Sequence, residues 1–541
     1  MPGADVDGTG SGSGLTRRAV LAGFAATGAG VALPATRARG APLLLTAPDR
    51  PRALTSGAAF PDGVLAGCPR TDGATLWTRV PGGADLALVV SRRADLRRPE
   101  RVLAVRSAEG SDDTVHVDLT GLQAGAEYHY QFRGADSASD VGRFRTLRPP
   151  DSRQPVRIGF FACQAYTEGF YAAHRHLAEA DLDLVVCLGD YVYDASFPGV
   201  RGLDANLFPQ TLGAMRRKYV AYRRDPDLRA MHARHAFVPM WDDHEFRNNY
   251  SRDGWTFPLL YGDLAGLDIL IPHQRKMAWA WQAWFEHMPV PRVPGDPLRT
   301  YRRLRLGRTV ELFTQDSRQY RTAQACGDPD AGGPCAAADD PANTMLGPAQ
   351  EAWLLRGLRA SRASWKVLAN ADMMMGMAVD DAGSRHSMDA WDGYGAERTR
   401  ILSAIARDVR DVVVVTGDQH ESYAGELWDT GFAPGTASGA QANPPGRRRA
   451  SVEFVVTSVT SANTGDQHGA TAATTTAGER LARNPHMRAA DLASHGYGVL
   501  EADERGVRFD YRFVDRARAD AAADPGPSFH VARGSRRLEP A

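Results

Sequence analysis

The sequence predicts a small all-β domain followed by a large layered α/β domain. Between residues 60 and 146, short stretches alternate apolar and polar positions and are separated by glycine-containing turns. From residue 156 onward, apolar strand-like runs alternate with helical stretches, a pattern typical of a layered α/β domain. Ahead of both regions, a paired arginine precedes a run of small and apolar residues.

Residues 1–41 are predicted to be a twin-arginine export signal. Arg17 and Arg18 precede a weakly hydrophobic run at 19–33 and then a small-residue segment. That run is shorter than the roughly 20 residues needed to cross a bilayer. We therefore expect export by the twin-arginine machinery to the periplasm, cell wall or medium, with no integral membrane span.

The overall composition indicates a globular protein. The chain has 541 residues, of which 43% are hydrophobic and 24% charged, which excludes a disordered or polytopic membrane protein. Its 64 basic residues balance 64 acidic ones, so nothing indicates nucleic-acid binding. Five cysteines are too few for a disulfide scaffold. Cys326 and Cys335 are expected either to pair after export or to remain free thiols. A monomer or small oligomer suits this composition.

The β domain is predicted at residues 55–148. Leu86, Leu88 and Val90 alternate with other positions, as in a half-buried strand. Tyr128 follows a turn, as does the corner tyrosine of an immunoglobulin- or fibronectin-like sandwich. A stiff Leu-Arg-Pro-Pro linker at 147–150 closes this domain.

The α/β domain is predicted at residues 152–515. Expected strands are 156–161, 182–188, 237–241, 310–313, 365–369, 412–416 and 454–458, with a closing hairpin of 497–501 and 507–514. Expected helices include 172–180, 275–287 and 348–360. The tail at 516–541 is rich in Ala, Pro and Arg, and it either caps the site or is disordered.

Polar residues lie at the carboxyl ends of four of the expected strands. This is the position at which ligands bind in open α/β sheets. The strings are Cys163-Gln164, Gly189-Asp190-Tyr191-Val192-Tyr193-Asp194, Asp242-Asp243-His244-Glu245-Phe246-Arg247-Asn248-Asn249 and Gly417-Asp418-Gln419-His420. Carboxylates gathered at one place repel one another and lose hydration, so a cation is expected among them. Two metal ions bridged by one carboxylate would meet this need and would suit phosphoryl chemistry.

These strings resemble, in order, those of the PhoD-like alkaline phosphatases and phosphodiesterases of the calcineurin-like metallophosphoesterase superfamily, some of which are phospholipase D enzymes. The resemblance covers roughly residues 15–515. It implies a four-layer sandwich, with two central β-sheets flanked by helices. It also implies a secreted, metal-dependent phosphohydrolase that cleaves phosphodiesters, and phosphomonoesters as a further class, by attack of a metal-activated water or hydroxide.

The resemblance also implies a metal-ligand set. Asp190 would bridge the two metals, and Cys163 and Tyr193 would bind Fe3+. Cys163 could otherwise be a small core residue. The same resemblance assigns Asn248 and His420 to a second site that holds Ca2+.

Two of these assignments have alternatives. Calcium prefers oxygen ligands, so His420 could instead contact the substrate or the iron. Asp418 could serve either ion.

Catalytic roles are implied for Asp243, His244 and Arg292. His244 is expected near the phosphate as an acid or hydrogen-bond donor, or else as a structural histidine bonded to a carboxylate. Arg292 would clamp the phosphate through its bidentate fork. The family reads Met-Pro-x-Arg at this point, whereas this chain has one residue more in Met288-Pro289-Val290-Pro291-Arg292, so Arg318 is the reserve candidate.

Two alternative functions follow from other features. A phospholipase D would have an apolar rim, which Trp255, Trp279, Trp281 and Trp284 could form unless they are core residues. A non-enzymatic binding module could act through the β domain, although this leaves the acidic strand ends unexplained. The second Gly-Asp-Gln-His string, at 465–468, is expected to be coincidental.

Overall fold

The computed structural model describes residues 55–56, 60–108, 110–197, 199–202, 211–254, 273–326, 333, 335–380, 386–429 and 446–541. The expected export signal at 1–41 and the proposed rim residue Trp255 lie outside these described residues. Within the described part of the chain, we find no helix with both the length and the apolar character needed to cross a membrane.

Two large β-sheets form the centre of the molecule. In spatial order, the ten-stranded sheet contains β23 (Glu539–Pro540), β22 (Ala523–Ala532), β21 (Gly506–Val514), β20 (His495–Ala502), β10 (Val156–Phe161), β11 (Leu184–Cys187), β12 (Ala236–Pro239), β2 (Val64–Arg70), β3 (Gly73–Arg79) and β6 (Thr114–Leu119). The seven-stranded sheet contains β13 (Arg302–Leu306), β14 (Val310–Thr314), β15 (Trp365–Asn370), β16 (Val412–Thr416), β18 (Arg449–Val455), β17 (Ser422–Trp428) and β19 (Met487–Asp491). Neighbouring strands run parallel from β10 through β11 and β12 to β2 in the ten-stranded sheet, and from β14 through β15 and β16 to β18 in the seven-stranded sheet.

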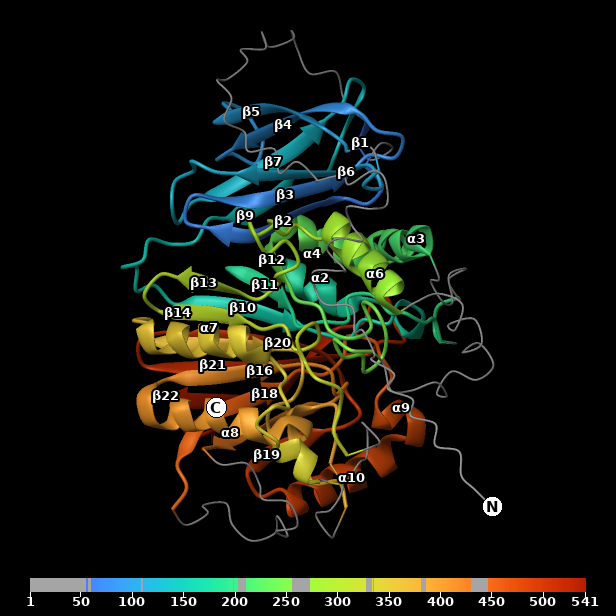
Figure 1. Ribbon diagram of the computed structural model, residues 1–541. Helices are drawn as coiled ribbons and strands as arrows, with labels where there is room; N and C mark the ends of the chain where they lie inside the picture. The colour runs from blue at the N-terminus through green and yellow to red at the C-terminus, as the bar shows by residue number, and fades with distance from the viewer. Residues whose placement is uncertain are drawn as a thin grey trace, which may run out of the picture.

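Helices cover the outer face of each sheet, while the inner faces pack on each other. Phe454 of β18 stacks on Phe509 of β21 with ring centroids 4.3 Å apart, which joins the two sheets. One outer layer contains α2 (Ala172–Glu179), α3 (Leu212–Arg223), α4 (Pro226–Arg234) and α6 (His273–His287). The other contains α7 (Gly347–Ala360), α8 (Gly395–Asp408) and α10 (Ala470–Arg483) (Figure 1). This confirms the predicted four-layer sandwich.

The N-terminal region is all-β, as predicted, and lies at one end of the molecule (Figure 1). A second sheet of this region contains β1 (Thr55–Ser56), β4 (Asp85–Ser91), β5 (Arg101–Arg106), β7 (Glu127–Arg133), β8 (Ser137–Ala138) and β9 (Gly142–Arg145). The Tyr128 hydroxyl accepts a hydrogen bond from the Gln123 backbone N–H at 2.9 Å, as a corner tyrosine does. Ala66 of β2 pairs with Ala236 of β12, so the ten-stranded sheet continues from the catalytic region into the N-terminal region.

Several expected elements shift, and the tail forms a further strand of the ten-stranded sheet. Residues 156–161 and 412–416 are strands with the predicted bounds. The strand expected at 454–458 instead begins at Arg449 and ends at Val455. The tail is not disordered, because β22 pairs antiparallel with β21 and extends the ten-stranded sheet. Cys326 and Cys335 form a disulfide, which decides between the two expected states.

Candidate metal centre and active site

Four loops that follow parallel strands bring the predicted polar residues to one edge of the two sheets. Cys163 follows β10, Asp190 follows β11, Asp243 follows β12, and His420 follows β16. Because parallel strands point the same way, their carboxyl ends meet at this edge. Cys163, Asp190 and Asp243 are each at most 2% exposed, whereas His420 is half-buried.

The backbone at these positions is held in an unusual conformation. Cys163, Asp190, Asp418 and His420 have φ angles of 55°, 54°, 65° and 60°. The left-handed region is uncommon for residues other than glycine, and such residues cluster at ligand clamps and active sites. This conformation turns each strand abruptly into its loop, so each side chain is placed at the sheet edge by a constrained backbone.

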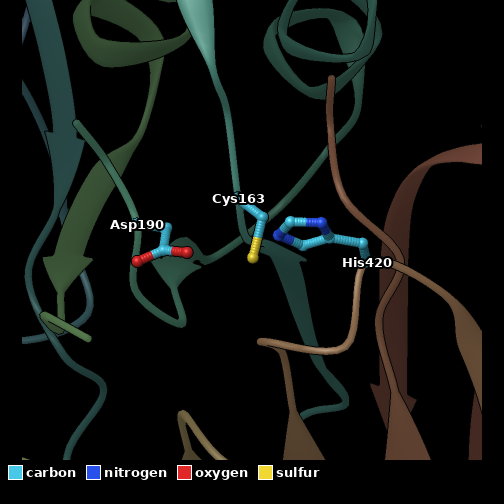
Figure 2. A group of neighbouring side chains, drawn as sticks. All are labelled: Cys163, Asp190 and His420. Carbon is cyan, nitrogen blue, oxygen red and sulfur yellow. The ribbon is translucent and has the colours of Figure 1, made fainter. Parts of the chain in front are cut away.

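Cys163, Asp190 and His420 form one group of potential ligands, whose donor atoms all lie within 4.8 Å of one another (Figure 2). The Tyr193 hydroxyl oxygen lies 3.1 Å from Nε2 of His420 and extends this group. Nδ1 of His420 is 2.9 Å from the Ala462 carbonyl, to which it donates, so Nε2 keeps its lone pair. Burial lowers the pKa of His420 to about 4, so the ring is neutral at neutral pH.

Two further groups adjoin the first. Donor atoms of Asp190, Asp243 and His244 lie within 4.8 Å of one another, as do those of Asp242, Asp243 and Asp418. Asp190 therefore belongs to two groups and lies between them. The half-buried Asn248 lies four residues after His244.

The chemistry of the donors fits bound cations. Burial raises the pKa values of the Cys163 thiol, the Tyr193 phenol and the Asp190 carboxyl well above their usual ranges. Oδ1 of Asp243 is buried without a hydrogen-bond partner among the described residues. A cation compensates buried anionic donors and reverses such shifts. Thiolate, phenolate, imidazole and carboxylate suit a transition metal, and the carboxylates suit calcium.

His244 is held by a carboxylate. Its Nδ1 lies 2.6 Å from Oδ1 of Asp194, and its ring stacks on that of Tyr193 with centroids 4.2 Å apart. Burial opposes the charged form, but the carboxylates of Asp243, Asp190 and Asp194 outweigh it and raise the pKa of His244 to about 10. With Nδ1 fixed in this bond, Nε2 is the nitrogen that can meet a phosphoester. A bond to a neighbouring carboxylate is one of the roles the sequence predicts for His244, and that carboxylate is Asp194.

Arg318, the reserve phosphate clamp, is enclosed by carboxylates. It is fully buried and donates to Asp242, to Asp389 at 2.6 Å and to Asp418 at 3.1 Å. A fourth carboxylate oxygen, of Asp372, lies 2.8 Å from its Nη2. Sequence reasoning missed Asp372 and Asp389. Asp372 follows the end of β15 by two residues, which is a usable signal, whereas Asp389 follows no strand.

The described contacts of Arg292 are with other parts of the molecule. Its guanidinium lies 3.5 Å from the centre of the Phe285 ring, and its Nη1 donates to the Pro297 carbonyl at 2.9 Å. Neither contact is with a residue of the ligand groups, so the structure does not bring Arg292 to them. Trp281 and Trp284 of the suggested apolar rim are buried against Trp241 in the core.

Two residues that the sequence argument gave no metal role nonetheless shape the surrounding loops. Glu245 accepts hydrogen bonds from the backbone N–H groups of Asp190, Tyr191 and Asp242, which fixes two ligand-bearing loops to each other. Asp466, in the repeated Gly-Asp-Gln-His string, forms a capping box with Asn463 at the start of α9 (Thr464–His468). The repeat thus has a structural use as a helix cap.

Comparison with known proteins identifies the family. The model of the PhoD-like phosphatase family matches residues 158–511, and that of the PhoD-like phosphatase N-terminal domain matches residues 46–148. The chain belongs to the PhoD-like phosphatase family. This PhoD-like phosphatase is 32% identical, over 453 residues, to alkaline phosphatase D of Bacillus subtilis (strain 168), covering 79% of this chain and 73% of the relative. A solved structure described as PhoD superposes with a TM-score of 0.78 at 29% identity, covering 91% of this chain and 93% of that one.

These similarities establish the reaction class. The PhoD-like phosphatase is a hydrolase of phosphoric esters of the alkaline phosphatase D type. Its candidate metal-binding groups lie on the strand-end loops where the sequence strings predicted them.

Proposed function

We propose that this PhoD-like phosphatase is an exported enzyme that hydrolyses phosphodiesters, and phosphomonoesters as a further class, at a centre holding Fe3+ and Ca2+. The observation that carries the proposal is the position of Asp190, which shares one ligand group with Cys163 and His420 and another with Asp243 and His244. A carboxylate in that position suits a bridge between two cations.

The two proposed sites differ in their donors. Cys163, Tyr193 and His420 would hold Fe3+ together with Asp190, because phenolate and carboxylate oxygens are hard donors. Asp243, Asp418 and Asn248 offer the oxygen atoms that calcium prefers. When bound, such ions supply positive charge to the phosphoryl oxygens and lower the pKa of a water molecule.

His244 and Arg318 have separate proposed tasks. With Asp194 on Nδ1, His244 presents Nε2 to the ester and protonates the leaving oxygen or donates a hydrogen bond to a phosphoryl oxygen. Arg318 holds the carboxylates of Asp242 and Asp418 in place rather than clamping phosphate, since carboxylates surround it. We propose no phosphate-binding role for Arg292, because its contacts are with Phe285 and Pro297.

Metal analysis combined with activity assays tests the centre. Purified protein is expected to contain iron near one per chain together with calcium, and to cleave bis-p-nitrophenyl phosphate and p-nitrophenyl phosphate until chelated. Asp190→Ala is expected to lose turnover and metal together. Asp520→Ala changes an exposed aspartate and is the matched control. Full activity of Asp190→Ala, or of chelated protein, would contradict the proposal.

Export is tested separately. The paired Arg17 and Arg18 ahead of a weakly hydrophobic run support the twin-arginine route. Replacing both by lysine is expected to leave the precursor inside the cell, while the unchanged chain is recovered outside the inner membrane. Equal recovery of both forms outside would argue against this route.

A further inference from the structure

The hydroxyl of Ser461 contacts two of the proposed iron ligands, Tyr193 and Cys163. It is fully buried in the loop after β18. Its Oγ lies 2.6 Å from the Tyr193 hydroxyl oxygen and 2.8 Å from the Cys163 carbonyl oxygen, and it accepts a hydrogen bond from the Ala165 backbone N–H. Ser458 donates to the Ser461 carbonyl at 2.6 Å, which is a contact with the main chain of Ser461 and not with its hydroxyl.

The Ser461 hydroxyl has a single hydrogen for two possible acceptors. When Tyr193 is a phenol and donates its own hydrogen to the Ser461 oxygen, the Ser461 hydrogen goes to the Cys163 carbonyl, which can only accept. As a ligand of a bound cation, Tyr193 would be a phenolate. The phenolate oxygen can then only accept, and a charged acceptor attracts the hydrogen more strongly than a neutral carbonyl.

His420, the other described hydrogen-bonding partner of the Tyr193 hydroxyl, cannot take over this role. Its Nδ1 hydrogen is used at the Ala462 carbonyl, which leaves Nε2 as an acceptor. Ser461 is therefore the donor that the described contacts provide to a Tyr193 phenolate.

We propose that Ser461 is a positioning residue whose hydroxyl donates to the Tyr193 phenolate in the metal-loaded enzyme, fixing the phenolate and reducing its electron donation to iron. The inference rests on the proposed function, because it takes Tyr193 as an iron ligand. Hydrogen bonds to metal ligands tune the affinity and the electronic properties of a metal site. Ser461 acts through Tyr193 and Cys163.

The test is the visible absorption of iron-loaded, full-length protein. An Fe(III)–phenolate pair absorbs by charge transfer from ligand to metal, and Tyr193→Phe is expected to abolish the band. Ser461→Ala is expected to shift the band to longer wavelength, because a phenolate without the hydrogen bond is more electron-rich. The same variant is expected to lose about 10- to 100-fold in iron affinity, measured by competition with a chelator, because losing the fixed position of the phenolate outweighs its stronger electron donation.

Two further variants separate this role from a general packing effect. Ser461→Thr keeps the hydroxyl and is expected to keep the wild-type band. Ser458→Ala removes an equally buried hydroxyl of the same loop that bonds to Ser461 and His495, and it is expected to leave the band in place. An unchanged band and unchanged affinity in Ser461→Ala would overturn the proposal.

The outcomes also distinguish this inference from the function on which it rests. Wild-type protein that binds iron without a band removed by Tyr193→Phe would refute Tyr193 as a ligand. If Ser461→Ala fails to fold, resonance Raman spectra of the wild type in H2O and D2O decide the matter. The phenolate C–O stretch is expected to shift on deuteration, and the absence of a shift would overturn the role of Ser461.

Discussion

The Tyr193 hydroxyl oxygen lies 3.1 Å from Nε2 of His420, although 227 residues separate the two along the chain. Tyr193 comes from the loop after β11 in one sheet, and His420 comes from the loop after β16 in the other. The ligand groups therefore lie where the edges of the two sheets meet. Stacking of the sheets, as at Phe454 and Phe509, is a condition for the site.

The pair formed by His244 and Asp194 predicts a non-additive mutational effect. His244→Ala is expected to lower kcat by about 10²- to 10⁴-fold, the range for loss of a general acid. Asp194→Ala is expected to cost about 10- to 100-fold, the range for a residue that orients another. Because Asp194 acts through His244, the double variant is expected to be no worse than His244→Ala. Steady-state kinetics of all three variants give the coupling, and multiplied losses would argue against it.

Arg318 predicts a large stability effect. Arg318→Met leaves the carboxylates of Asp242, Asp372 and Asp389 buried without this cation, which is expected to cost about 3–5 kcal/mol in the free energy of unfolding. Arg318→Lys keeps the charge without the planar fork, so an intermediate loss is expected. Urea unfolding measures both variants. Arg518→Met, at an exposed ion pair, is the control, and an equally small effect at both positions would contradict the prediction.

Two buried histidines predict a loss of stability in acid. Burial lowers the pKa values of both His235 and His486 to about 4, while the unfolded chain takes up these protons near pH 6.5. The stability that these two histidines contribute to the folded state is therefore fully present above pH 6.5 and is lost as the pH falls toward 4. His486→Gln keeps a donor for the Gly376 carbonyl and is expected to narrow the difference in Tm between pH 7 and pH 4.5. An unchanged difference would contradict this assignment.

The candidate metal ligands after the strands were predictable from the sequence, because each ligand follows its strand within a few residues. Val156–Phe161 leads directly to Cys163, and Val412–Thr416 leads to Asp418 and His420. Periodicity and local strings carry that information without any knowledge of the partner strands.

Contacts between residues on different loops were not predictable in the same way. The bond from Ser461 to Tyr193 spans 268 residues, and the one from Arg318 to Asp389 spans 71. No local sequence pattern marks either contact, because the packing of the two sheets decides which loops meet. The roles of Arg292 and Arg318 could not be separated for the same reason: charge and residue type are shared, and only burial among carboxylates distinguishes them.

The continuous sheet predicts that the N-terminal β region does not fold alone. Trp77 of β3 is fully buried, and its Nε1 donates to the Glu286 carbonyl of α6 at 2.8 Å. The Arg223 guanidinium of α3 lies 4.1 Å from the centre of the Trp77 ring. A fragment of residues 60–150 would expose this tryptophan together with the edge of β2 that pairs with β12.

An exposed strand edge beside an apolar surface favours aggregation, so the 60–150 fragment is expected to be aggregated or unfolded. Size-exclusion chromatography and thermal unfolding followed by circular dichroism check this, with the full chain as the control. A monomeric fragment with a cooperative transition would show that β2 and Trp77 do not depend on β12 and α6. Such a fragment would also reopen the possibility of an independent binding module, because a module of that kind has to fold without the catalytic sheets.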